Sequence, residues 1–158
     1  MPPHVAARAL IDELEADGIP YELVPHRRTT TARAEAEALG VEPEEIAKTL
    51  VLGTSTGPVR VVLPASERLD LRKVRRVLGD DDVELLTEAA LADAYPEFEL
   101  GAVPPIGGEH DDRVLVDQTV RDHALVLLEA GSHDESIRIS SADLVRLARV
   151  TLADIRVD

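Results

Sequence analysis

The sequence contains no cysteine, and this absence excludes several kinds of chemistry. A thiol nucleophile, a disulfide framework and a zinc site with cysteine ligands are all ruled out. Long apolar runs are missing too, since no stretch approaches the roughly 18 uninterrupted apolar residues of a membrane span. The 158 residues suffice to bury a core without disulfides. We therefore expect one domain over residues 1–158, located in the cytoplasm and with no membrane partner.

Basic residues are scarce. The chain has 17 Lys and Arg against 31 Asp and Glu, which gives a formal net charge of −14. Such acidity argues against general affinity for nucleic acid, because phosphate binding normally relies on a basic surface. Any contact with nucleic acid must then be local. The only lysines are Lys48 and Lys73. A lysine ammonium is a compact point charge and can fill roles that the planar guanidinium of arginine cannot.

The apolar spacing predicts an ordered series of helices and strands. Helices are expected at about residues 3–17, 31–40, 68–78, 87–95 and 140–149, with a helical turn over 43–49. The helix at 31–40 is capped by Thr31 and stopped by Gly40. Strands are expected at 21–24, in a hairpin over 49–63, and at 83–86, 113–117, 124–131, 135–140 and 152–158, the last as an edge strand or tail. Most strand pairs are joined by turns too short for parallel crossovers. The predicted fold is α+β, a single compact domain with a mixed, mainly antiparallel sheet flanked by helices.

The segment GAVPPIG, residues 101–107, is unusual because it suits neither a helix nor a strand. Each proline fixes φ and removes an N–H donor, whereas each glycine allows conformations that a side chain would block. One interpretation is a preformed wall whose N–H groups, at Gly101, Ala102 and Val103, face a carbonyl oxygen as an oxyanion site does. The alternative is a tight connection between a helix and a strand.

Lys48 lies where the helical turn EEIAK meets the first strand of the hairpin. A side chain at such a junction can enter a cleft while its backbone stays rigid. Lys48 could there hold a phosphate or ribose, or orient an ester carbonyl. The alternative is a solvated lysine at a helix end, which the helix dipole favours.

Among the five histidines, His133 is the most interesting because it lies in a turn between two predicted strands, beside Gly131 and Ser132. A neutral histidine there could position water or a hydroxyl, whereas the alternative is an exposed loop residue. His110 could join Asp111 and Asp112 at a metal ion. Adjacent residues rarely converge on one ion, however, so we do not expect a metal. No cofactor is expected either.

Two further basic features are local. Residues 26–28, His-Arg-Arg, form a small basic patch in a loop. The helix at 68–78 carries Arg68, Arg72, Arg75 and Arg76 on one side, where a phosphate backbone could dock, although such a face is often only a solvated surface. Residues 53–57, Gly-Thr-Ser-Thr-Gly, match G-x-S-x-G only as a string, because they form the predicted turn of the hairpin and not a strand-to-helix elbow, so a serine hydrolase is disfavoured.

Five segments in order carry a resemblance to a known family. They are EEIAKTLVL, the hairpin ending VRVVLP, the loop GAVPPIG, the strand RVLVD, and ALVLLEAGSHDESIRISSADLVRLA. Together they resemble the YbaK/EbsC and ProX group, which are free-standing relatives of the insertion editing domain of bacterial prolyl-tRNA synthetases. The resemblance covers about residues 5 to 155.

The resemblance implies an enzyme that hydrolyses the ester of mischarged aminoacyl-tRNA in trans, for example tRNA for proline carrying alanine or cysteine. It implies that Lys48 holds the terminal adenosine of the tRNA, that the G-x-x-x-P loop from Gly101 to Pro105 shapes the aminoacyl pocket, and that residues 131–133 form a variable segment of the site. The resulting assignments are catalytic Lys48, Gly101 and His133, substrate-binding Ala102, Val103, Pro105, Gly131 and Ser132, and tRNA-binding Arg72 and Arg76. The expected partners are the acceptor end of an aminoacyl-tRNA and a synthetase.

This modest set of residues suits an activated ester, because the site needs mainly to position water and stabilise the developing oxyanion. A second site that removes errors is needed, because the binding free energies of similar side chains in a synthetase pocket differ by only about 1–3 kcal/mol per methylene. We therefore expect the 101–107 loop to be rigid. Two alternatives remain open: a non-catalytic module that binds aminoacyl-adenosine, a nucleotide or a protein, and a hydrolase of another small ester or amide.

Overall fold

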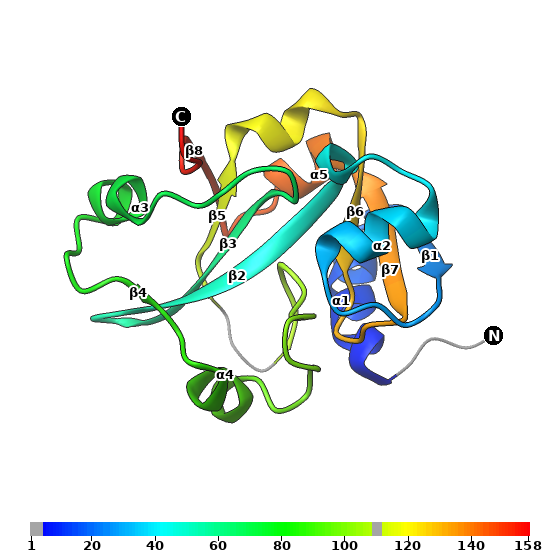
Figure 1. Cartoon of the computed structure of the whole chain (residues 1–158), viewed down its shortest axis with the longest axis horizontal. Coiled ribbons are helices and arrows are strands. Elements are labelled where there is room, and N and C mark those ends of the chain that lie inside the picture. Colours follow the sequence, from blue (N-terminus) through cyan, green and yellow to red (C-terminus); the bar gives the residue numbers. More distant parts are fainter. Residues whose placement is uncertain (1–4, 109–111) are drawn as a thin grey trace.

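The structure is a computed structural model of the whole chain, and it describes residues 5–108 and 112–158 (Figure 1). The α-helices are α1 (Val5–Ala16), α2 (Ala32–Leu39), α3 (Leu71–Leu78), α4 (Glu88–Ala94) and α5 (Ser141–Val145). The 3-10 helices are η1 (Pro43–Glu45) and η2 (Gln118–Asp122). The strands are β1 (Glu22–Pro25), β2 (Ile46–Thr54), β3 (Gly57–Pro64), β4 (Glu84–Leu85), β5 (Val114–Asp117), β6 (Leu125–Glu129), β7 (Glu135–Ser140) and β8 (Val150–Ala153).

The described strands all belong to one mixed sheet. Its order is β1-β7-β6-β2-β3-β5-β8, and β4 adds to β2 beside this path. The pairs β1–β7, β6–β7, β2–β3 and β2–β4 are antiparallel, whereas β2–β6, β3–β5 and β5–β8 are parallel. The predicted α+β fold with a mixed, mainly antiparallel sheet is confirmed.

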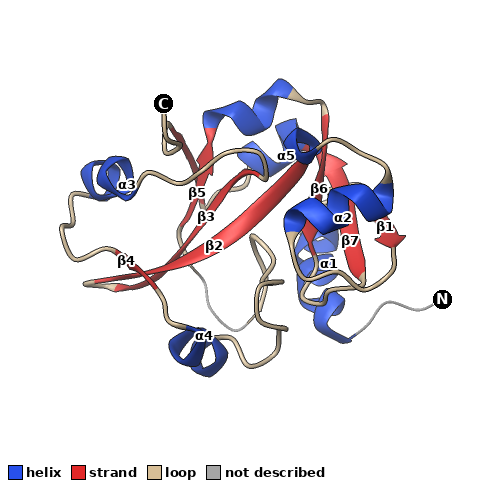
Figure 2. Ribbon diagram, viewed as in Figure 1, coloured by secondary structure: helices blue, strands red, loops and turns tan. Residues whose placement is uncertain are grey.

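Helices cover both faces of the sheet, and the alternation along β2 shows which helix covers which face (Figure 2). Ala47 packs in the cluster that contains the apolar side of α1, and Val51 packs with the region around α4. On the opposite face, Ile46 packs with α2, and Leu50 and Leu52 pack with α3. Since side chains alternate along a strand, Lys48 belongs to the α2 and α3 face, between these two clusters.

Local signals in the sequence explain where several elements end. Thr31 caps α2 by accepting a hydrogen bond from Ala34 N, and Gly40 ends that helix in the left-handed conformation, both as predicted. Asp70 and Gly79 do the same for α3. The turn of the β2–β3 hairpin is anchored by Ser55, whose backbone N–H and hydroxyl both donate to Asp80.

Three local predictions are wrong, and strand pairing explains two of them. The helical turn over 43–49 ends at Glu45, because residues 46 and 47 pair with β6 and start β2. Lys48 is therefore inside a strand and not at a helix end. The last helix stops at Val145, because residues 150–153 pair with β5 as the edge strand. The 3-10 helix η2 was not expected at all.

The membrane prediction concerns helix length and polarity. Within residues 5–108 and 112–158, the structure has no helix that is long and apolar enough to cross a bilayer.

Candidate functional site

The 101–107 loop is attached to the turn that precedes β7. Gly131 N donates to Ala102 O at 2.8 Å, and Glu99 N donates to Gly131 O at 2.8 Å. Gly101 starts the loop with φ of 81°, which a residue with a side chain adopts only under strain. These bonds join two segments that are far apart in the sequence, so the loop and the turn form one wall.

The turn and the loop also lie tightly against α1. A Cβ atom on Gly131 would lie 2.8 Å from Ala6 O, and one on Gly107 would lie 2.7 Å from Ala9 O. Both distances are shorter than real Cβ contacts allow. Two of the glycines flanking the site are therefore required for close backbone packing.

A buried arginine from β3 holds the 101–107 loop from behind. Arg60, whose relative exposure is 1%, donates to Pro104 O at 2.8 Å and to Gly107 O at 2.6 Å. Its Nε donates to Asp112 Oδ2 at 2.9 Å, and the hydroxyl of Tyr95 donates to the same oxygen. The guanidinium also lies 5.0 Å from the centre of the Tyr95 ring. The loop is thus fixed by charged hydrogen bonds as well as by its prolines.

His133 fixes the start of the loop. Its Nε2 lies 2.6 Å from Leu100 O, and because a carbonyl oxygen only accepts, Nε2 carries the proton. The backbone carbonyl of His133 accepts from Thr29 N at 2.9 Å, which ties in the segment before α2. The predicted catalytic histidine therefore lies against Gly101, with Cε1 3.5 Å from the position a Cβ would take there.

Lys48 is half-buried behind the same region. Its Nζ donates to Glu67 O at 2.6 Å. Burial lowers the pKa of the Lys48 ammonium from its ordinary value, while the carboxylates of Glu129 and Glu67 act in the opposite direction. Lys48 is therefore linked electrostatically to Glu129, which stands at the end of β6.

Two carboxyl groups that the sequence analysis did not single out lie on the same side of the sheet. Burial raises the pKa of Glu129 well above its ordinary range, and the charge of Glu35 adds to this rise. Burial also raises the pKa of Glu35, which accepts a hydrogen bond from the Ser136 hydroxyl. The backbone N–H of Thr49 donates to Glu129. Each carboxyl still has an oxygen, Oε2, that is buried without a hydrogen-bond partner among the described residues.

A narrow crevice joins these groups. It is lined by residues 29–32, Glu35, Gly101, Ala102, Glu129, Ser132 and His133. Its volume is about 20 Å³, room for little more than one water molecule. The crevice brings together four of the predicted site residues, Gly101, Ala102, Ser132 and His133, with the two carboxyls.

The other predicted residues lie around the crevice. Val103 and Pro105 are buried, and Val103 packs against Val51, Tyr95 and Phe98. Lys48 does not line the crevice, but its charge acts on Glu129, which does. Of the three N–H groups expected to face a carbonyl oxygen, that of Ala102 already donates to Glu99 O at 3.0 Å.

The predicted tRNA-binding arginines lie on α3. Arg72 and Arg76 are exposed, and the Arg72 guanidinium lies 3.6 Å from Asp70. Figure 1 shows α3 and α2 towards opposite ends of β2. Because both helices pack on the face that carries Lys48, the arginines lie on the same face of the sheet as α2, which supplies Glu35 to the crevice.

The metal candidate can be described only in part. His110 and Asp111 lie outside the described residues, and Asp112 is bound by Arg60 and Tyr95. Among the residues that the structure describes, no group of three or more His, Asp or Glu could hold a metal ion.

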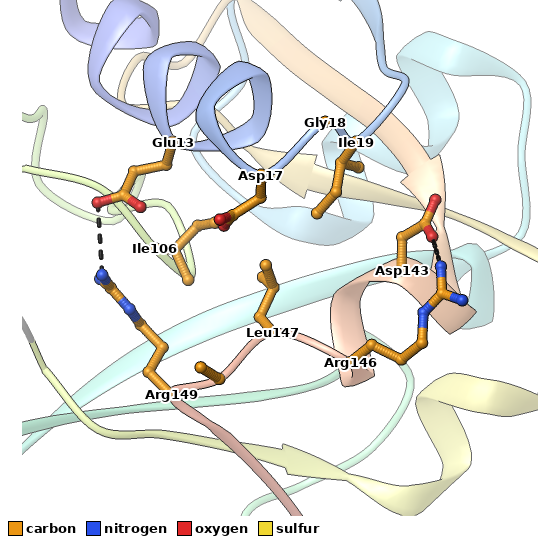
Figure 3. Close-up of a pocket in the computed structure, with 10 residues that line it drawn as sticks. Glu13, Asp17, Gly18, Ile19, Ile106, Asp143, Arg146, Leu147 and Arg149 are labelled. Carbon is orange, nitrogen blue, oxygen red and sulfur yellow. Dashed lines mark hydrogen bonds and ion pairs between the residues drawn. The ribbon is translucent and has the colours of Figure 1, made fainter.

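A larger hollow lies between the end of α1 and the segment that joins α5 to β8 (Figure 3). It has a volume of about 450 Å³. Four of its five charged side chains are engaged with one another, since Arg149 lies 3.5 Å from Glu13, and Arg146 bonds Asp143. It contains only Ile106 of the 101–107 loop and none of the predicted site residues, so we do not place the site there.

Two of the missed residues had a signal in the sequence. Arg60 is the only charged residue in the strand GPVRVVLP, and Glu129 is the only one in LVLLE. A lone charge in an apolar strand must be paired or functional, because burying it otherwise is costly. Glu35 gave no such signal, since it is one of two acids in the α2 sequence ARAEAEAL.

The model of the aminoacyl-tRNA editing domain family matches residues 26–147. The Enterococcus faecalis protein named "Putative Cys-tRNA(Pro)/Cys-tRNA(Cys) deacylase EbsC" is 29% identical over 136 residues, which are 85% of this chain and 82% of that protein. A proline–tRNA ligase of Thermosipho melanesiensis is 31% identical over 107 residues, 66% of this chain but only 18% of the ligase. The crystal structure described as "a putative trans-editing enzyme for prolyl tRNA synthetase" superposes with a TM-score of 0.89 at 25% identity, covering 99% of this chain and 100% of that one.

Proposed function

The chain belongs to the aminoacyl-tRNA editing domain family, and from this premise we propose that it is a trans-editing deacylase that hydrolyses the ester of mischarged aminoacyl-tRNA. The observation that carries the proposal is the crevice between the 101–107 loop and residues 131–133, with Lys48 behind its Glu129 wall. The relatives named as deacylase and trans-editing enzyme support the same chemistry.

Ester hydrolysis fits this set of groups. Water adds to the ester carbonyl, the bond from the carbonyl carbon to the ribose oxygen breaks, and the proton that water loses ends on the ribose hydroxyl. An aminoacyl ester is already activated, so orientation and stabilisation of the oxyanion are the main requirements. We assign the Gly101 N–H to the carbonyl oxygen, Lys48 to the terminal adenosine, and His133 to fixing Gly101 and positioning water.

The substrate is a small amino acid, with alanine or cysteine on tRNA for proline as the first candidates. Walls held by Arg60 and by the packing of Gly131 keep the crevice narrow, which favours a short side chain over a proline ring. A rigid wall is what a sieve requires, because a soft pocket would also accept the correct, larger amino acid.

The nucleic-acid contact is local. The chain carries a net charge of −14, so binding relies on a few cations around the crevice and not on a basic surface. We assign the acceptor end of the tRNA to the face with Lys48 and the exposed Arg72 and Arg76 of α3. A synthetase that supplies the mischarged tRNA is a further proposed partner, and the cytoplasm is the proposed location.

The test is deacylation of a panel of mischarged tRNAs, with Lys48→Ala as the variant. The chain offers a matched control in its other lysine, Lys73, which bonds Asp154 and Asp158. We expect accelerated hydrolysis of at least one tRNA carrying a small amino acid, a loss of about 100-fold in Lys48→Ala, and little change in Lys73→Ala. If no aminoacyl-tRNA is hydrolysed faster than its spontaneous rate, the proposal fails. Ligand-dependent stabilisation without turnover would then indicate a binding module.

A further inference from the structure

The two carboxyl groups of the crevice present unused acceptors to any ligand that enters. Glu35 is 5% exposed, and its Oε2 has no hydrogen-bond partner among the described residues. Oε2 of Glu129 likewise has no hydrogen-bond partner among the described residues, although the Thr49 N–H donates to the Glu129 carboxyl group. Buried polar atoms are normally paired, so two orphaned acceptors lining one crevice indicate that the partner comes from outside.

We propose that Glu35 and Glu129 form a subsite that binds the α-ammonium group of the aminoacyl ester. This inference rests on the proposed function and adds a specific requirement for a free amine. The pair supplies two acceptor oxygens in a space of about 20 Å³, which suits an ammonium group because it is the size of a water molecule.

The charges around the crevice favour one added cation. Glu35 and Glu129 repel each other, and burial disfavours their ionised forms. Lys48 acts on Glu129 from behind, and His26 and His133 act on Glu35. A ligand ammonium next to the two carboxyl groups would supply a positive charge that favours their ionised forms and offsets their mutual repulsion.

A series of hydrogen bonds behind Glu35 holds one of its two carboxyl oxygens. His26 Nδ1 lies 2.6 Å from Arg27 O and therefore carries a proton. His26 Nε2 lies 3.0 Å from the Ser136 hydroxyl, which in turn bonds Glu35 Oε1. These hydrogen bonds engage Oε1 of Glu35, so Oε2 is the oxygen left to accept from a ligand.

A metal cation is a poorer fit for the same acceptors. Two carboxyls are fewer ligands than Ca²⁺ or Zn²⁺ ordinarily takes, and no third His, Asp or Glu joins them in a metal-binding group within the described part of the chain. An ammonium needs only two or three acceptors, since it has three N–H donors.

The experiment compares two non-hydrolysable probes: adenosine carrying alanine through a 3′-amide, and the same compound with its α-amine acetylated. We expect the full-length protein to bind the free amine at least about tenfold more tightly, as one charge-assisted hydrogen bond would give. Glu129→Gln and Glu35→Gln should abolish this preference. Glu37→Gln, on the exposed side of the same helix α2, should keep it.

A second measurement separates this inference from the proposed function. Hydrolysis of alanyl-tRNA should be much faster than that of N-acetylalanyl-tRNA. If both tRNAs are hydrolysed at equal rates, or both probes bind equally, the ammonium subsite is wrong and the deacylase proposal stands. If neither probe binds and neither tRNA is hydrolysed, both are wrong. The wild-type comparisons need no variant, so they decide the question even if a Gln variant fails to fold.

Discussion

Replacing Arg60 with methionine would remove the group that holds the 101–107 loop. The guanidinium makes charged hydrogen bonds to Pro104 O, Gly107 O and Asp112, all buried. Breaking a buried ion pair by removing one partner costs about 3–5 kcal/mol, because the other charge stays buried. For a chain of this size each kcal/mol lowers Tm by about 2–4 °C, so we expect Tm to fall by roughly 10 °C.

The assay is urea and thermal unfolding of Arg60→Met, with Arg33→Met on the exposed side of α2 as the control. The control should change stability by less than about 0.5 kcal/mol. The double variant Arg60→Met/Asp112→Asn should lose about 1–3 kcal/mol less than the sum of the two single variants, because the unpaired charge is gone. If Arg60→Met lowers the free energy of unfolding by less than about 1 kcal/mol, or if the effects of the two single variants simply add in the double variant, Arg60 does not hold the loop as described.

Three further predictions follow from the site. First, Lys48→Ala should reduce kcat/KM for deacylation by about 100-fold with the fold intact, and a rate equal to that of Lys73→Ala would remove Lys48 from the site. Second, Gly131→Ala should lower the free energy of unfolding by about 2–3 kcal/mol, because its φ is 94° and the new Cβ would meet the backbone of α1. The control Gly18→Ala, with φ of 66° and open space around it, should lower it by only about 1 kcal/mol. Equal losses would show that the contact with α1 is irrelevant. Third, the pKa of Glu129 is raised from its ordinary 4.5, so the folded state binds the proton more tightly than the unfolded state, and the free energy of unfolding falls as the pH rises above about 4.5 toward the folded pKa. Glu129→Gln should flatten this fall, measured by urea unfolding between about pH 5 and 8. An unchanged pH dependence would contradict the burial of Glu129.

Much of the fold could be predicted from local signals. The caps Thr31 and Gly40 bound α2 as expected, and the hairpin forms around its polar turn. The errors came from pairing between distant segments. Residues 46 and 47 have no local preference strong enough to oppose pairing with β6, and residues 150–153 are drawn to β5 in the same way.

The site was predictable only in part for a related reason. The 101–107 loop could be predicted from its prolines and glycines, because these residues constrain or free the backbone at their own positions. The groups that hold the loop and complete the crevice come from residues far along the chain: the guanidinium of Arg60, the N–H of Gly131 and the carboxyl of Glu35. Burial created the significance of Glu35, and a sequence of alternating acids does not show which of them will be buried.

The most direct test of the central claim is single-turnover deacylation of alanyl-tRNA for proline, with the protein in excess. The account predicts release of alanine well above the spontaneous rate, with prolyl-tRNA left intact. Equal release from the alanyl and prolyl forms would contradict the rigid sieve, and no release above the spontaneous rate from any tRNA carrying a small amino acid would contradict the enzyme itself.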